Sequence, residues 1–388
     1  MKEYPLVPLG TLISQAKKVR CGEEDYPVLS MTMHNGLIFQ DKKFKKVIAS
    51  QDRSNYKVVY RNQLVISFPI DEGVLAAQRI TDAGIVSPAY GIWDIDQEKI
   101  LPEFLECALR CERALNYYKS KLRGSTARRR SLPTSTLLAF NVPLPSISEQ
   151  LNVLAIVHKL KSVIDTRKEE INVLDKLVKA RFVEMFEGGE NQWGQKKLVE
   201  CCNNKNDIKC GPFGSQLHVE DYQNVGIPVY GIPEVNSGFK INPKLYVSRL
   251  KAEELSSYNL IPGDVAVSRK GNVGQAALFH DELKNGIIHS DVLRIRLNEQ
   301  ILNPLFLIGE LHFSQGIRNQ VMQASNGAIM PGTNVTKLKK IIIDVPPLSM
   351  QMKYSTLVQQ VEKSKSVIQK SLDEMQILFQ SLMQKYFG

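Results

Sequence analysis

One acidic pattern in the sequence has the composition of a metal-dependent nuclease site. Asp264 follows a Pro-Gly turn, and Glu282 and Lys284 stand further along the chain. In such sites the carboxylates bind Mg²⁺ and the lysine stabilises charge that develops on the phosphate. The match is loose, because Gln63 stands at the corresponding place 201 residues earlier and a turn before a strand explains Asp264 equally well. We therefore keep the nuclease only as an alternative.

Other chemical motifs are incomplete. Residues 344–347 resemble the motif of amino-methyltransferases, but Val345 interrupts it and Leu348 replaces the aromatic residue that would hold a flipped base. The glycine-containing segment 211–215 lacks the lysine of a phosphate-binding loop. The six cysteines have no Cys-x-x-Cys spacing and the six histidines are scattered. The sequence therefore predicts reduced thiols and no catalytic, cofactor-binding or metal-binding residue in this chain.

Length and charge indicate a multidomain protein with a polyanionic partner. A chain of 388 residues exceeds the roughly 250 that one core supports, so we expect at least two domains. The formal net charge of +10 favours nucleic acid as the partner. Residues 1–133 carry 21 basic and 15 acidic side chains, whereas residues 189–333 carry 14 of each, so the first segment is the better candidate for anchoring phosphates. We find no membrane-spanning run or secretion signal and expect a cytoplasmic protein.

Two basic clusters stand out. Residues 119–130 contain six cations and no acid, and Lys42–Lys46 place an aromatic residue among four cations. Such loops can follow a phosphate backbone, although a charge run can equally be a solvated face. His289, beside Ser290 and Asp291, is interpreted as a strand end where a base contact is possible. Since Arg, Lys, Gln and Asn can read base edges, the predicted DNA-binding residues are Lys42, Lys43, Lys45, Lys46, Arg53, Arg79, Lys121, Arg123, Arg128, Arg129, Arg130, Lys209, Gln216, Lys240, Arg269, Lys270, Asn272, His289 and Arg318.

These side chains must be positioned by a duplicated frame. A shift of 201 residues places residues 140–150 over residues 341–351, with Pro145, Ser148 and Gln150 on identical residues. The same shift places 63–67 over 264–268, and one further residue of shift aligns 84–86 with 286–288. Matches in this order at a nearly common offset indicate an internal repeat over nearly the whole chain. Short β-branched runs between turns predict a mixed α/β segment in each copy, with one helix over 102–118 and another over 304–323.

Each copy is predicted to end in a long amphipathic helix. Ser146 and Glu149 have the spacing of a capping box, Ser349 is the expected cap of the second helix, and the first helix is expected to stop at residues 188–189 in a left-handed turn. The apolar stripes favour an antiparallel coiled coil between the two helices, with an ordinary core helix against a sheet as the alternative. The packing residues would be Leu160, Ile164, Ile171, Leu174, Val178, Phe182, Val361, Ile368, Leu372, Met375, Phe379 and Leu382.

On this frame the chain resembles the specificity subunits (HsdS) of Type I restriction-modification systems. The start of each long helix resembles that of the family's helical spacers, and other segments resemble its target-recognition domains. The segments that carry the resemblance are Val142–Pro145 with Glu149 and Gln150, Val345–Pro347 with Gln351, Tyr222–Gly231, Ile261–Val265, Ser268–Gly271, Gly286–Asp291, Ala49–Tyr56 and Gly84–Pro88. The second copy departs from the first at Met350, where the first has a glutamate, and lacks the arginine cluster.

The resemblance implies an α+β fold in which two mixed α/β target-recognition domains form a pseudo-two-fold tandem repeat separated by two long helices in an antiparallel coiled coil. The expected boundaries are 1–145 and 189–345 for the domains and 146–188 and 346–388 for the helices. The implied partners are double-stranded DNA, two methyltransferase subunits and possibly restriction subunits, which would carry S-adenosylmethionine, ATP and Mg²⁺. Each domain would read half of a split site, and the helices would set the gap. A non-catalytic scaffold with duplicated heads is the alternative.

Overall fold

The fold was analysed in a computed structural model, which describes residues 4–33, 35–41, 53–122, 132–188, 193–270, 274–325 and 334–388. The chain forms two compact units. Unit 1 comprises Met1–Lys168 with Lys370–Gly388, and unit 2 comprises Glu169–Gln369. Each unit therefore contains one globular segment and a part of both long helices, α4 (Ile147–Phe182) and α10 (Leu348–Phe387).

Unit 1 is built around a small antiparallel sheet with the strand order β2-β9-β6-β7. Three strand pairs, β1 with β10, β3 with β4 and β5 with β8, complete its described β-structure. The strands are β1 (Leu6–Pro8), β2 (Ile13–Gln15), β3 (Leu29–Thr32), β4 (Gly36–Phe39), β5 (Lys57–Tyr60), β6 (Leu64–Ile66), β7 (Leu75–Ala77), β8 (Ala83–Val86), β9 (Gly91–Ile95) and β10 (Asn141–Pro143).

The prediction of one continuous helix over residues 102–118 is wrong. The chain instead forms α1 (Pro102–Arg110) and α2 (Glu112–Lys121), and α3 (Thr134–Leu138) follows. Cys111 lies between α1 and α2 in extended conformation, with ψ 161°. The Tyr118 hydroxyl donates a hydrogen bond to the Leu109 carbonyl, 3.2 Å away, and so connects the two helices. Because both pack on the same core, the apolar spacing runs through the break and conceals it from the sequence.

Unit 2 has two sheets, with strand orders β12-β20-β17-β18 and β13-β15-β14-β19-β16, and the pair β11 with β21. Its strands are β11 (Gly194–Lys197), β12 (Ile208–Cys210), β13 (Tyr222–Gln223), β14 (Ile227–Tyr230), β15 (Leu245–Val247), β16 (Asn259–Leu260), β17 (Val265–Ser268), β18 (Ala276–Leu278), β19 (Gly286–Ile288), β20 (Val292–Ile295) and β21 (Ile342–Val345). Its short helices are α5 (Ile232–Asn236), α6 (Arg249–Glu254), α7 (Pro304–Phe313), α8 (Gln315–Ser325) and α9 (Val335–Leu338). The helix expected over 304–323 is thus also broken, at Ser314.

The two units share one topology, which confirms the internal repeat. The order β2-β9-β6-β7 in unit 1 corresponds to β12-β20-β17-β18 in unit 2, and all these pairs are antiparallel. The segments that the sequence aligned form equivalent strands, β6 with β17 and β8 with β19. Moreover, β5 pairs with β8 as β16 pairs with β19, both antiparallel. The unit 2 sheet around β14 is more extensive than its counterpart.

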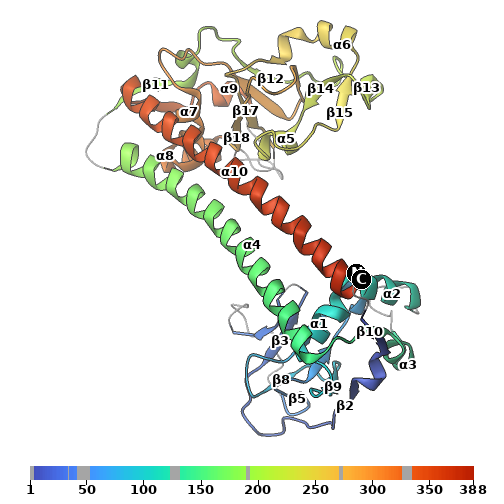
Figure 1. The fold of residues 1–388 in the computed structure, drawn as a ribbon. Coiled ribbons are helices and arrows are strands. Elements are labelled where there is room, and N and C mark those ends of the chain that lie inside the picture. The colour runs from blue at the N-terminus through green and yellow to red at the C-terminus, as the bar shows by residue number, and fades with distance from the viewer. Residues whose placement is uncertain are drawn as a thin grey trace. The chain divides into compact units, whose positions relative to one another are not determined.

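The long helices pair in antiparallel orientation, and in each unit a segment of α4 lies beside a segment of α10 (Figure 1). In unit 1 the Lys161 ammonium lies 5.9 Å from the centroid of the Phe379 ring. In unit 2 the Lys365 ammonium is 2.7 Å from an Asp175 carboxylate oxygen. Every residue of the two apolar stripes is buried or half-buried.

The helix ends agree only partly with expectation. Ser146 and Glu149 form the capping box, because the Ser146 N–H donates to the Glu149 carboxylate at 3.1 Å and the Glu149 N–H to Ser146 Oγ at 3.4 Å. The Ser349 cap is wrong, since α10 already begins at Leu348 and the Pro347 carbonyl accepts the Met350 N–H. The predicted left-handed turn at the end of α4 is also wrong at Gly188, whose φ is −91°. A π-helical turn over Val183–Glu187 follows α4 instead.

Gln150 and Gln351 hold the start of each long helix on its unit. Gln150 is fully buried; its Oε1 accepts the Leu101 N–H at 2.8 Å, and its Nε2 donates to the Lys99 and Pro145 carbonyls, each at 2.9 Å. Gln351, equally buried, makes the same three bonds to the equivalent turn and proline of unit 2. The identical glutamines in the repeat are therefore structural. Among the described helices, none is long and apolar enough to cross a membrane.

Candidate nucleic-acid interface

In unit 2, three predicted DNA-binding residues meet at one edge of the β12-β20-β17-β18 sheet. Since β12 and β17 each run antiparallel to β20, their last residues lie at the same edge, where β20 begins. Arg269 and Lys270 follow β17, and His289 lies in the turn before β20. We call this surface, with Phe213 and Asp291, the β17–β20 edge.

Arg269 and Phe213 form a cation–π pair at the β17–β20 edge. The Arg269 guanidinium lies 5.2 Å from the Phe213 ring centroid, within the range of a cation–π contact. Its Nη1 donates to the Ser290 carbonyl at 3.1 Å, so Arg269 is held in place and covers one face of the ring. The Phe213 side chain is 53% exposed. The preceding Gly211 leaves no room for a side chain, because an added Cβ would lie 2.3 Å from the His289 carbonyl oxygen.

Asp291 organises the polar part of the same edge. Its Oδ1 lies 2.7 Å from the Lys270 ammonium, and its backbone N–H donates to His289 Nδ1 at 3.2 Å. With Nδ1 accepting, the neutral ring carries its proton on Nε2 and can donate from there. The edge therefore contains two cations, a histidine donor and one carboxylate, so it suits an anionic partner that also offers acceptors.

A second cationic group lies on the strands of the same sheet. Lys209 and Arg294 stand directly opposite each other on β12 and β20. The Lys209 ammonium lies 4.2 Å from the Tyr258 ring centroid, and the Tyr258 hydroxyl donates to Gln216 Oε1 at 2.7 Å. Burial, and then the charge of Arg294, lowers the pKa of Lys209. Arg294 Nε is buried and has no hydrogen-bond partner among the described residues. The predicted residues Lys209 and Gln216 therefore do lie together.

The equivalent edge of unit 1 contains residues that the sequence did not predict. Phe68 follows β6 at the position equivalent to Arg269, and its side chain is 59% exposed. The Tyr90 ring meets it edge to face, with centroids 6.2 Å apart. The Lys57 ammonium donates to the Tyr90 carbonyl at 2.7 Å, and burial followed by the nearby charge of Lys18 lowers its pKa. We call these four residues the β6–β9 edge; their like charges also suit an anionic partner.

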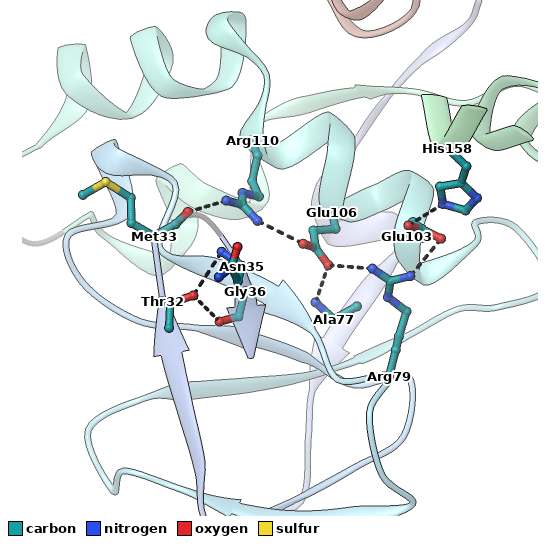
Figure 2. A network of polar contacts seen from close by, with 10 residues as sticks. All are labelled: Thr32, Met33, Asn35, Gly36, Ala77, Arg79, Glu103, Glu106, Arg110 and His158. Carbon is teal, nitrogen blue, oxygen red and sulfur yellow. Dashed lines mark hydrogen bonds and ion pairs between the residues drawn. The ribbon is translucent and has the colours of Figure 1, made fainter. Parts of the chain in front are cut away.

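Arg79, predicted to bind DNA, is engaged in an ion-pair network within unit 1 (Figure 2). Its guanidinium lies 2.8 Å from a Glu103 carboxylate oxygen and 3.7 Å from one of Glu106. His158 on α4 lies 2.7 Å from Glu103, and Arg110 bonds both Glu106 and the Met33 carbonyl.

Burial raises the pKa of the Glu103 carboxyl, but the hydrogen bond from His158 and the charge of Arg79 together bring it below its usual value. The network connects the turn after β3 and the loop after β7 to α1 and α4 (Figure 2). Arg79 thus helps to attach the loop after β7 to α1.

The remaining predicted residues are dispersed. The Lys240 ammonium is 3.6 Å from Glu362 on α10, and Arg318 donates to the Gln315 side chain within α8 at 3.1 Å. Lys121 is exposed at the last turn of α2, and Arg53 is half-buried before β5. The predicted residues that lie outside the described parts of the chain are Lys42, Lys43, Lys45, Lys46, Arg123, Arg128, Arg129, Arg130 and Asn272.

The nuclease alternative has no support in the geometry. Both oxygens of the fully buried Asp264 carboxylate accept hydrogen bonds from Arg296 at 2.8 Å, and Oδ2 also accepts the Ile261 N–H. This carboxylate is occupied by a structural ion pair. Within the described ranges, no group of three or more His, Cys, Asp or Glu side chains could hold a metal ion.

Comparison with known proteins identifies the domain. Residues 191–376 match the family described as Type I restriction modification DNA specificity domain. A putative type I restriction enzyme specificity subunit, MjaX, from Methanocaldococcus jannaschii is 24% identical over 174 residues. Just under half of the chain, residues 191–376, is thus similar to a Type I DNA specificity domain. The aligned residues are 43% of this chain and 40% of the MjaX protein, so they span well under two thirds of that relative.

Two solved structures have a fold similar to that of this chain. A chain from a study of complex assembly and conformational transition in a type I restriction-modification system has a TM-score of 0.58 and 18% identity, covering 99% of this chain and 97% of that one. The S subunit from M. genitalium has a TM-score of 0.58 and 14% identity, covering 100% and 96%. At these identities the likeness concerns the fold alone, and it includes both units and both long helices.

Proposed function

We propose that this chain is a specificity subunit, the non-catalytic DNA reader of a Type I restriction-modification complex. Each unit reads one half of a split, asymmetric site, and the paired helices set the unread gap between the halves. Two methyltransferase subunits dock on the chain, and restriction subunits join the same assembly. The chemistry, with its S-adenosylmethionine, ATP and Mg²⁺, belongs to those partners.

The observation that carries this proposal is the pair of equivalent sheet edges with unlike side chains. The β6–β9 edge offers Lys57 beside the Phe68–Tyr90 pair, whereas the β17–β20 edge offers Arg269, Lys270 and His289 with the carboxylate of Asp291. One frame presented twice with different donors fits two different half-sites, because base identity is read through the donors and acceptors at base edges.

The test is to map modified adenines in cells that express this chain with a Type I methyltransferase subunit. The expected result is one new motif made of two unlike halves with a fixed unread gap. Exchanging Arg269, Lys270 and His289 for alanine together should alter the second half only. A matched control is Leu250→Ala, a substitution at an exposed apolar residue of the same unit.

If the co-expressed pair adds no motif, the proposal is wrong and the scaffold alternative gains support. DNA cleavage by the purified chain with Mg²⁺ alone would contradict its non-catalytic role. In that case Asp264→Asn would have to abolish the cleavage for the nuclease alternative to stand.

A further inference from the structure

Two exposed phenylalanines occupy corresponding edges of the two units. Among the phenylalanines that the structure describes, only Phe68 and Phe213 are exposed, with 59% and 53% of their side-chain surface accessible. Phe68 follows β6, and Phe213 lies in the turn after β12, which ends at the same edge of its sheet as β17. The strands β6 and β17 are equivalent, so each candidate interface presents one exposed phenyl ring.

Each ring is supported from within its own unit. The Arg269 guanidinium lies over Phe213 at 5.2 Å, and Tyr90 meets Phe68 at 6.2 Å. The Arg269 side chain is tied to the backbone by its bond to the Ser290 carbonyl, and the backbone of Tyr90 is held by the Lys57 ammonium, which donates to its carbonyl. The rings are therefore held at the surface. Because Arg269 covers one face, Phe213 cannot stack between two bases and offers only its other face and its edge.

The surroundings of both rings are cationic. The Lys57 ammonium donates to the Tyr90 carbonyl, and Lys18 is close enough to Lys57 for its charge to lower the pKa of Lys57. Lys270 and His289 share the β17–β20 edge with Phe213. An apolar ring among cations complements DNA, whose phosphates flank apolar deoxyribose and base surfaces.

We propose that Phe213 and Phe68 make the apolar, sequence-independent contact of each unit with duplex DNA, packing against deoxyribose and base edges between the phosphate contacts. This inference rests on the proposed function. Its sequence independence follows from the comparison of the two edges. Their polar residues differ, as two unlike half-sites require, but the exposed ring is common to both. A phenyl ring also lacks the hydrogen-bonding groups that distinguish one base from another.

The experiment measures binding of the full chain, co-purified with its methyltransferase, to two labelled duplexes. One duplex contains the mapped site and the other has the same composition in scrambled order. Phe213→Ala and Phe68→Ala should each weaken binding to both duplexes by a similar factor, about tenfold, the size typical of losing one aromatic contact to nucleic acid. The slope of affinity against salt should not change, because an apolar contact displaces no counterions. The methylated motif should also stay the same.

Three variants serve as controls. Phe213→Leu keeps an apolar side chain and should recover most of the affinity, whereas Leu250→Ala, also at an exposed position of unit 2, should bind as the unmodified chain does. Lys270→Ala should lower the salt slope. Fluorescence of Trp193, in unit 2, should show that the Phe213 variants unfold at the unmodified urea midpoint.

Unchanged affinity in both phenylalanine variants would overturn the inference. So would a loss confined to the specific duplex or a changed motif, because Phe213 or Phe68 would then read a base. Failure of the proposed function is distinguishable from either result, since the unmodified complex itself would then fail to prefer its mapped site.

Discussion

Replacing Gln150 by alanine should destabilise unit 1 far more than a surface change on the same helix. The substitution leaves one N–H and two carbonyls, those of Leu101, Lys99 and Pro145, without their present partner. Each buried polar group that loses its partner costs about 1–3 kcal/mol, and carbonyls find alternative donors more easily than N–H groups find acceptors. We expect a loss of about 3–5 kcal/mol in the free energy of unfolding, of which removal of the side-chain volume is a minor part.

The two tryptophans of the chain allow the loss to be assigned to one unit. Trp93 is in β9 of unit 1 and Trp193 precedes β11 of unit 2. In a Trp193→Phe background, urea unfolding followed by fluorescence reports unit 1 alone. Gln150→Glu adds a test of donor chemistry, because a carboxylate can still accept the Leu101 N–H but cannot donate to the two carbonyls.

The matched control is Asn152→Ala, at an exposed position in the next residues of α4. It should change the free energy of unfolding by no more than about 0.5 kcal/mol. The reasoning is refuted if Gln150→Ala shifts the Trp93 transition no further than this control does. It is equally refuted if Gln150→Glu is as stable as the unmodified chain at neutral pH.

Three further predictions address other parts of the molecule. Asp264→Asn breaks the ion pair with Arg296, and the Trp193 transition should show a loss of about 2–4 kcal/mol, given that Arg296 keeps some contact with solvent; a stable variant would contradict a structural role. Burial, and then neighbouring carboxylates, raises the pKa of Glu310 to about 8. Between an unfolded pKa near 4.5 and this folded value the native state binds more protons, so unit 2 should lose stability as pH rises by up to about 1.4 kcal/mol per pH unit, and Glu310→Gln should remove that fall in urea titrations at several pH values. Inserting seven residues after both residue 170 and residue 369 lengthens each paired helix by about 10 Å, so the mapped gap should grow by about three base pairs with both half-sites unchanged; an unchanged gap would contradict the role of the helices as a spacer.

Local patterns predicted the frame of this protein well. The repeat, the equivalence of β6 with β17 and the Ser146 capping box were all visible in the sequence, because each depends on residues close together in the chain or on one constant offset. The breaks at Cys111 and Ser314 were not, since helices on both sides face one core and the apolar spacing continues across them.

The candidate interface was harder to predict because distant strands create it. Phe68 and Tyr90 carry no charge and match no motif, and only the sheet order brings them to one edge beside Lys57. Counting cations also misses partners within the fold: Arg79 was predicted to contact DNA, but it lies between Glu103 and Glu106. The repeat offered one indication of this interface, because Phe68 lies at the position equivalent to Arg269, which the sequence analysis did predict to bind DNA.

The duplication separates positions that hold the fold from positions that can differ. Gln150 and Gln351 make the same three bonds, and both sheets keep one strand order. The edge strands β7 and β18 are intermediate between these two classes, because the same kind of backbone group is bound in both units but by different side chains. The Ala77 N–H of β7 is bound by Glu106 of α1, whereas the Ala276 N–H of β18 is bound by His312 of α7, both at 3.0 Å.

The same need, a partner for an unpaired strand N–H, is thus met by different side chains. At the β6–β9 and β17–β20 edges, by contrast, the polar side chains and their contacts differ between the two units. Under the proposed function, these are the residues that would differ between the two half-sites, whereas the duplicated frame stays the same. An exposed phenylalanine nevertheless occurs at both edges, from a different strand in each unit, and this common feature is the basis for proposing a shared contact.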